Sequence, residues 1–218
     1  MALKTIGIPD DLHEYVIAHG ATPDPLMREL TAETRDQFAD VAHFQIAPEQ
    51  APFLTILTRS LNVRLAVEIG TFTGMSALSI ARGLPASGKL ICCDISEQYT
   101  GIARRYWRAA AVDDKIELRI GPAAETLAAM PADAAIDLAF IDADKTGYTT
   151  YWNEIVPRMR PGGLILVDNV LRGGRIVRPP TNPDDAAMGP FNDMVATDPR
   201  VQSAIMPFAD GITMAVKL

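Results

Sequence analysis

Residues 136–145 read Ile-Asp-Leu-Ala-Phe-Ile-Asp-Ala-Asp-Lys, an apolar run that ends in two aspartates and a lysine. Residues 164–169 repeat this arrangement as Leu-Ile-Leu-Val-Asp-Asn. Short apolar runs rich in β-forming residues are typical of buried parallel strands. Ligands bind beyond the carboxyl ends of such strands, so we expect both polar clusters to lie at one site.

The polar groups at these two strand ends are Asp142, Asp144, Lys145, Asp168 and Asn169. Carboxylate and amide oxygens suit a hard cation such as Mg²⁺ or Ca²⁺, whereas zinc prefers nitrogen and sulfur. A divalent cation site is therefore the first hypothesis. The alternative is that the aspartates cap the next helix and that Asp168 and Asn169 form a turn. Their joint occurrence at two strand ends favours the functional interpretation.

The composition predicts one compact α/β domain over residues 1–218, because 48% of its 218 residues are hydrophobic and 22% are charged. Within it we distinguish an N-terminal helical segment, residues 1–50, from an α/β core, residues 51–218. The net charge of −7 and the pI near 4.9 argue against a nucleic-acid partner, which would require a basic surface.

The N-terminal residues lack a long apolar segment, and no run reaches the length of a membrane span. We therefore expect a cytoplasmic protein with no membrane partner. Cys92 and Cys93 are adjacent on an expected strand and would point to opposite faces, so we expect two reduced, buried packing residues.

Helices are expected first, from Pro9 to a break at residues 20–23, at 25–40 and at 52–60. Strands and helices then alternate, which is typical of a right-handed parallel sheet. The expected strands are 65–69, 89–93, 115–120, 136–141 and 164–167, and the helices between them are 76–82, 97–111, 123–130 and 148–156. Residues 201–207 and 212–218 form a hairpin around an Asp-Gly turn.

Residues 172–189 contain Gly-Gly, Pro-Pro and Asn-Pro-Asp-Asp, and they form the longest segment without a regular pattern. They directly follow the second acidic cluster. Long irregular segments in compact domains are often functional, so this segment is predicted to be a substrate lid.

A glycine turn follows the first strand, where residues 68–76 read Glu-Ile-Gly-Thr-Phe-Thr-Gly-Met-Ser. Its two glycines allow a sharp turn and a close approach to a nucleotide-type cofactor before a helix begins. The dinucleotide fingerprint is absent, because Phe72 and Met75 occupy the positions of its second and third glycines. Asp94 ends the second strand, where it can accept hydrogen bonds from ribose hydroxyls. The alternative is that the glycines only allow tight packing and that Asp94 caps the following helix.

With these motifs the sequence resembles the class I S-adenosylmethionine-dependent methyltransferases, and among them the metal-dependent O-methyltransferases of the caffeoyl-coenzyme A and catechol type. The resemblance covers Phe44 to Leu218 and, more loosely, the chain from Lys4. Its most specific segments are 68–74, 140–145, 161–165, 168–171 and 210–213. The family fold is a doubly wound, Rossmann-like, seven-stranded sheet, mostly parallel with an antiparallel last strand, and we expect it here with N-terminal helices added.

The resemblance also implies roles for individual residues. The cofactor S-adenosyl-L-methionine would contact Ile46, Glu68, Gly70, Thr71, Ser76, Asp94, Ala123, Asp142 and Asp144. The metal, Mg²⁺ or another divalent cation such as Ca²⁺ or Mn²⁺, would bind Asp142, Asp168 and Asn169. Asp142 and Lys145 would be catalytic, with Lys145 as a candidate general base.

The implied acceptor is a catechol or a hydroxycinnamoyl compound that binds the cation, and the implied assembly is a homodimer. Plant members that use coenzyme A thioesters typically have Trp-Asn-Gly where this chain has Arg172-Gly173-Gly174. Arg172 and Arg175 could bind an anionic acceptor or be solvated at a lid. Lys4 roughly aligns with a lysine that contacts coenzyme A phosphates in those plant enzymes.

Two other functions fit part of the sequence. A nicotinamide-dependent oxidoreductase would explain the alternating fold and Asp94, but it leaves Asp168 and Asn169 without a role. A non-catalytic S-adenosylmethionine-binding module would explain the glycine turn, but it does not require an intact metal set.

Overall fold

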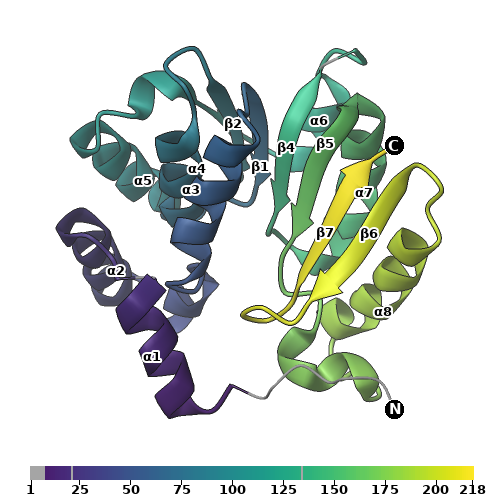
Figure 1. Ribbon diagram of the computed structural model, residues 1–218, viewed down its shortest axis with the longest axis horizontal. Coiled ribbons are helices and arrows are strands. Elements are labelled where there is room, and N and C mark those ends of the chain that lie inside the picture. Colours follow the sequence, from purple (N-terminus) through teal and green to yellow (C-terminus); the bar gives the residue numbers. More distant parts are fainter. Residues whose placement is uncertain (1–7, 21, 134) are drawn as a thin grey trace.

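The alternating apolar runs form one seven-stranded sheet with the order β3-β2-β1-β4-β5-β7-β6. The computed structural model describes residues 8–20, 22–133 and 135–218, so Lys4 lies outside the described residues (Figure 1). The strands are β1 Leu65–Ile69, β2 Lys89–Asp94, β3 Ile116–Ile120, β4 Ile136–Ile141, β5 Met159–Val167, β6 Val201–Met206 and β7 Ile212–Lys217.

Helices cover both faces of the sheet, with α3 to α5 on one side and α6 to α8 on the other (Figure 1). The α-helices are α1 Asp10–Gly20, α2 Pro25–Gln37, α3 Gln50–Ser60, α4 Met75–Gly83, α5 Glu97–Ala109, α6 Ala123–Ala128, α7 Tyr148–Ile155 and α8 Pro183–Ala196. Short 3₁₀ helices lie at η1 Ala39–Phe44, η2 Asp113–Lys115, η3 Lys145–Gly147, η4 Val156–Arg158 and η5 Arg172–Val177.

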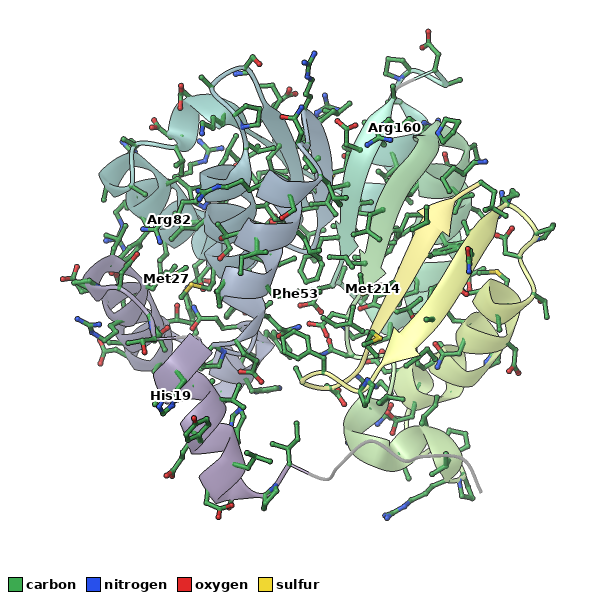
Figure 2. All side chains as sticks on the ribbon, viewed as in Figure 1. His19, Met27, Phe53, Arg82, Arg160 and Met214 are labelled. Atoms are coloured by element: carbon green, nitrogen blue, oxygen red, sulfur yellow. The ribbon has the colours of Figure 1, made fainter. Side chains whose placement is uncertain are left out.

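Two hydrophobic cores lie between the sheet and these helices, because successive strand residues point to opposite faces. Cys92 belongs to the core beneath α2 to α5, and Cys93 belongs to the core beneath α6 to α8. Both cysteines are free and buried, as expected. Phe53 of α3 and Met214 of β7 pack against the first core, which also contains Met27 of α2 (Figure 2).

The parallel strands β1, β2, β4 and β5 end at one edge of the sheet. Ile69 is paired with Cys93 and Ile141, and Ile141 is paired with Val167. Single hydrogen bonds continue the ladder into the loops: Gly70 donates to the Cys93 carbonyl at 2.9 Å, and Asp142 donates to the Ile69 carbonyl at 2.8 Å. The loops after these strands are therefore held side by side.

An ion pair links β4 and β5 near their amino-terminal ends, at the other end of the sheet. Arg160, labelled in Figure 2, donates to the Asp137 carboxylate. Asp137 also accepts the backbone N–H groups of Arg64 and Leu65 at 2.8 and 2.9 Å. These donors satisfy a partly buried carboxylate at the start of the sheet, away from the polar clusters.

The predicted strands and the hairpin are confirmed, and β7 runs antiparallel to both β5 and β6. The fold class is therefore the expected one. The predicted helix at 25–40 instead ends at Gln37 and continues as η1. None of the described helices is long and apolar enough to cross a membrane.

Strand β5 begins at Met159 and not, as predicted, at Leu164. Its first half contains Pro161, Gly162 and Gly163, which resemble a loop in sequence. The register with β4 is irregular there: Ile136 pairs with Met159, and Leu138 pairs with Leu164. The strand therefore carries an irregularity that accommodates proline and glycine without ending the pairing.

The prediction of an irregular segment is wrong for the second part of residues 172–189, which is helical from Pro183. It holds for the first part, where Gly173 and Gly174 interrupt η5 with left-handed conformations. Arg172–Val177 forms η5, and α8 begins at Pro183. Asn182 is the N-cap, and its side chain accepts from the Asp185 N–H at 2.8 Å. An Asn-Pro pair that suggests a turn is therefore the start of a helix, since proline is well tolerated at the first helical position.

Gly74 tests how closely the start of α4 packs against α5. Its φ is +86°, and an added Cβ would lie 2.5 Å from the Ala103 Cβ and 2.8 Å from the Trp107 Nε1. Gly74→Ala is expected to lower the free energy of unfolding by about 2–4 kcal/mol, because it adds both left-handed strain and a clash. Urea denaturation measures the change.

Gly101→Ala in α5 is the matched control, because a Cβ there meets no heavy atom within 4 Å. Alanine should stabilise this exposed helical position by roughly 0.5–1 kcal/mol. Equal effects of the two substitutions would contradict the role given to the Gly74 contacts.

Candidate active site

A cavity of about 1620 Å³ opens at the carboxyl ends of the parallel strands. It is lined by residues from the glycine turn, both acidic clusters, α1, and the loop between β6 and β7. Eleven of the twelve residues predicted for the site line it: Ile46, Gly70, Thr71, Ser76, Asp94, Ala123, Asp142, Asp144, Lys145, Asp168 and Asn169. The twelfth, Glu68, does not, because it lies within β1 and is fully buried.

The glycine turn packs directly against the first acidic cluster. Gly70 has a φ of +89°, and an added Cβ would lie 2.0 Å from the Asp142 carbonyl oxygen. A side chain at this position is therefore excluded by both backbone conformation and space. Gly74 ends the turn, and Ser76 lies in the first turn of α4.

Asp94 braces this turn from the neighbouring strand. One carboxylate oxygen, Oδ2, accepts the N–H groups of Thr71 at 2.9 Å and Phe72 at 2.8 Å, and Oδ1 accepts the Ser96 N–H at 2.8 Å. Asp94 therefore does not cap α5, because Ser96 is the N-cap and its side chain accepts the Tyr99 N–H. Asp94 still borders the cavity, so a contact with a ribose remains a prediction.

Glu68 is a buried acid beneath the same turn. Neither of its carboxylate oxygens has a well-aligned hydrogen-bond partner among the described residues. Burial raises the pKa of Glu68 to about 7, although interactions with Ser76, Thr71 and Cys92 lower it in part. A nearby cation would stabilise the ionised form of a buried carboxyl group that lacks a hydrogen-bond partner.

Lys145 and Asp142 form an ion pair in the lining of the same cavity. The Nζ of Lys145 donates to Asp142 Oδ1 at 2.9 Å and to the Tyr148 hydroxyl at 2.7 Å. The Tyr148 hydroxyl in turn donates to the Asp168 carbonyl at 3.1 Å. This chain of bonds fixes the Lys145 ammonium between the two acidic clusters.

Asp168 is buried beside this pair. Its Oδ2 accepts from Gln50 Nε2 at 2.8 Å, and its Oδ1 accepts the Asn169 N–H at 2.7 Å. Burial, followed by the charge of Asp142, raises the pKa of Asp168 to about 7. Two carboxylates that disfavour each other's charge form a site that a cation would stabilise.

The donor set fits a hard cation. In the described ranges no group of three His, Cys, Asp or Glu side chains is placed to bind a metal. The candidate set is instead two carboxylates and an amide, Asp142, Asp168 and Asn169, which provide only oxygen ligands of the kind Mg²⁺ and Ca²⁺ prefer. Asn169 has a φ of +59°, a conformation that asparagine adopts more readily than most residues.

Asp144, Ala123 and Ile46 line other parts of the cavity. Asp144 accepts hydrogen bonds from the hydroxyls of Tyr151 and Thr146, so its carboxylate is already partly satisfied. Its predicted contact with the cofactor would compete with these bonds.

The sequence did not reveal several residues that shape the site. Gln50 and Tyr148 hold the second acidic cluster, but nothing in the sequence relates Gln50 to an acid 118 positions away. An aromatic cluster of Phe38, Phe44, Phe72 and Tyr99 lies at the glycine turn, with Phe72 and Tyr99 centroids 4.9 Å apart. Phe72, the residue that breaks the dinucleotide fingerprint, is part of this cluster.

Known proteins share this fold and part of this sequence. The model of the O-methyltransferase family matches residues 18–218. The chain belongs to this O-methyltransferase family. The family excludes the nicotinamide-dependent oxidoreductase, and the resemblance noted in the sequence is confirmed.

Relatives of this O-methyltransferase include "Probable caffeoyl-CoA O-methyltransferase 2" of Dictyostelium discoideum, with 37% identity over 94% of this chain and 90% of the relative. The caffeoyl-CoA O-methyltransferase of Eucalyptus gunnii is 31% identical over 99% of this chain and 90% of its own. The solved O-methyltransferase of Bacillus cereus in complex with SAH has a TM-score of 0.87 and 28% identity, covering 95% of this chain and 97% of that one.

The buried Glu68 of this O-methyltransferase predicts a pH dependence of stability. Its pKa in the folded chain, about 7, lies above the ordinary value of 4.5. The unfolded chain therefore releases this proton first, and stability present at low pH is lost as the pH rises through about 7. Wild type should lose on the order of 3 kcal/mol more than Glu68→Gln between about pH 4 and pH 8.

Urea denaturation of the ligand-free protein across this pH range measures the difference. Asp168 contributes a similar slope to both proteins, so the comparison isolates Glu68. Glu125→Gln, at an exposed position in α6, is the control and should retain the wild-type slope. An unchanged slope in Glu68→Gln would show that Glu68 is ionised in the folded protein.

Proposed function

We propose that this enzyme transfers a methyl group from S-adenosylmethionine to a hydroxyl of a catechol-type acceptor that binds a divalent cation, with Mg²⁺ as the first candidate. The observation that carries the proposal is the meeting of two carboxylates and one amide, Asp142, Asp168 and Asn169, in the cavity that also contains the glycine turn.

The cofactor side of the cavity supports S-adenosylmethionine. The first turn of α4 at Ser76 offers backbone N–H groups to the methionine part, and Gly70 and Thr71 line the same cavity. Glu68 would favour the cationic end, and Asp94 would accept from the ribose. Ala123 would lie against the adenine, and Ile46 and Asp144 would complete the site. The relatives from Bacillus cereus and Streptomyces achromogenes were solved with SAH and SAM respectively.

The acceptor side lies where Asp142, Lys145, Asp168 and Asn169 line the cavity. When bound, the cation would lower the pKa of the acceptor hydroxyl, and S-adenosylmethionine would supply the methyl group. Asp142, Asp168 and Asn169 would hold and orient this end of the cavity. Gln50 and Tyr148 would keep the second cluster in place through their bonds to Asp168.

We assign the acceptor proton to Lys145. Lys145 lines the cavity, and its Nζ donates to Asp142 and Tyr148. To accept the proton it would have to be a neutral amine, and a divalent cation bound at Asp142 would favour that form by weakening the ion pair. The methyl donor and the acceptor oxygen would then be held in one cavity, and such positioning contributes to rate. We also propose a homodimer, which analytical ultracentrifugation tests.

The proposed function predicts metal-dependent methyl transfer. Labelled S-adenosylmethionine should transfer its methyl group to caffeic acid or another catechol in the presence of Mg²⁺. Excess EDTA should abolish the transfer, and added Mg²⁺ should restore it, because the acceptor hydroxyl would otherwise remain protonated. Transfer that is insensitive to EDTA would contradict the proposed metal dependence but not the proposed methyl transfer.

Asp168→Ala gives a second test of the same site. Turnover should fall at least about 100-fold, beyond the loss typical of residues that only support a metal ligand. Binding of S-adenosylmethionine, followed by calorimetry, should stay within a few fold. Asp193→Ala, at an exposed position in α8, is the control. Wild-type turnover in Asp168→Ala would remove Asp168 from the site.

Lys145→Met tests the general base. It should lower kcat by about 10²–10⁴-fold, and the loss should shrink as the pH rises and solvent takes the proton instead. Tyr148→Phe removes one bond to Lys145 without removing the amine, so its effect should be much smaller. A Lys145→Met enzyme with the kcat and pH profile of wild type would assign the proton to another group.

A further inference from the structure

Two arginines line the acceptor side of the cavity. Arg172 and Arg175 belong to η5, which begins three residues after Asn169, and both side chains border the cavity. Two guanidinium groups in such a position would ordinarily bind a carboxylate or a phosphate of the acceptor.

One buried carboxylate binds both arginines. Arg172 Nε donates to Asp185 Oδ1 at 3.1 Å, and Arg175 donates to Asp185 through Nε at 3.0 Å and through its terminal nitrogen at 3.2 Å. Arg172 also lies 3.6 Å from the Asp184 carboxylate. The side chain of Asp185 is 3% exposed, so the carboxylate is enclosed by the groups that bind it.

Asp185 is held in place from its own helix as well. Its N–H donates to Asn182 Oδ1 at 2.8 Å, and its Oδ2 accepts from Asn182 Nδ2 at 3.1 Å and from the Thr181 hydroxyl at 3.3 Å. The hydrogen bonds from Arg175 and Arg172 lower the pKa of Asp185 to about 2. The carboxylate therefore stays ionised near neutral pH, where it can hold both arginines.

The other charges of the cavity are mainly negative. Among the described lining residues, three are cationic and each is paired with a carboxylate: Lys145, Arg172 and Arg175. Eight lining residues are acidic: Asp10, Glu49, Asp94, Asp142, Asp144, Asp168, Asp184 and Asp210. Even a bound divalent cation and the single net charge of the cofactor would not balance this excess.

We infer that Asp185 sets the charge selectivity of the acceptor site: by holding Arg172 and Arg175, it makes the enzyme favour ortho-diphenols without an anionic substituent over those that end in a carboxylate or phosphate. This inference rests on the proposed function and narrows its substrate class. It separates this chain from its relatives named for caffeoyl-CoA, since coenzyme A carries several phosphate charges.

A matched pair of acceptors tests it. Dihydrocaffeic acid and its amide share one catechol ring, and their saturated linker keeps the ring electronics similar. With the full-length enzyme, saturating S-adenosylmethionine and Mg²⁺ at low ionic strength, kcat/KM for the amide should exceed that for the acid at least about tenfold. Added NaCl should reduce this ratio, because salt screens the repulsion.

Asp185→Asn should release the arginines and lower the ratio at least about fivefold, mainly through the KM of the acid. Asp193→Asn removes the same charge from an exposed position of α8 outside the cavity lining and leaves the bonds of Asp185 intact, so its ratio should stay within about twofold of wild type. Melting temperature and cofactor binding are measured for both variants, so that a folding defect is recognised.

A wild-type ratio near one, or a preference for the acid, would overturn the inference even if Asp185→Asn did not fold. Equal effects of the two variants would also overturn the inference. They would show that the net charge of the protein sets the ratio, and not the bonds of Asp185 to Arg172 and Arg175. Absence of transfer to every catechol would overturn the proposed function itself. Transfer with a ratio near one would leave that function standing and remove only the selectivity.

Discussion

The site depends on the parallel register of β1, β4 and β5. Their last residues are paired across the sheet, and the ladder continues by one hydrogen bond beyond each strand end. Asp142 donates to Ile69, and Asp168 donates to Ile141, so two loops distant in sequence are fixed at the same height. A slip of one residue would turn every side chain of the shifted strand to the opposite face and separate the two acidic clusters.

This register places ionisable groups where water does not reach them. Glu68 and Asp168 are both buried, and burial raises the pKa of each to about 7. An ordinary core would place apolar residues at such positions, because an unpaired buried charge destabilises the fold. The surrounding apolar cores must offset this loss of folding stability. A cationic ligand that binds the folded protein would stabilise it further. Binding and folding are therefore linked at these two carboxylates.

Much of the fold could be predicted from the sequence, because strands with apolar runs and helices with glycine starts are encoded locally. Prediction failed where tertiary packing overrode the usual conformational preference of a residue. Pro161 and the glycines after it lie inside β5, and the proline at 183 opens a helix that seemed to be part of a loop. The predicted site residues also came together, apart from Glu68, which lies beneath the cavity. The bonds of Gln50 to Asp168 and of Asp185 to two arginines could not be foreseen, because each depends on tertiary packing.

The contact between Gly70 and the Asp142 carbonyl has a consequence for sequence change in this family. The missing Cβ leaves room for the backbone of the neighbouring loop and for nothing else. A chain with a side chain at position 70 would need a differently shaped loop after β4, so the two segments must diverge together. Recombination between distant relatives with a breakpoint between β1 and β4 would join loops that were never fitted to each other, even where every catalytic residue was retained.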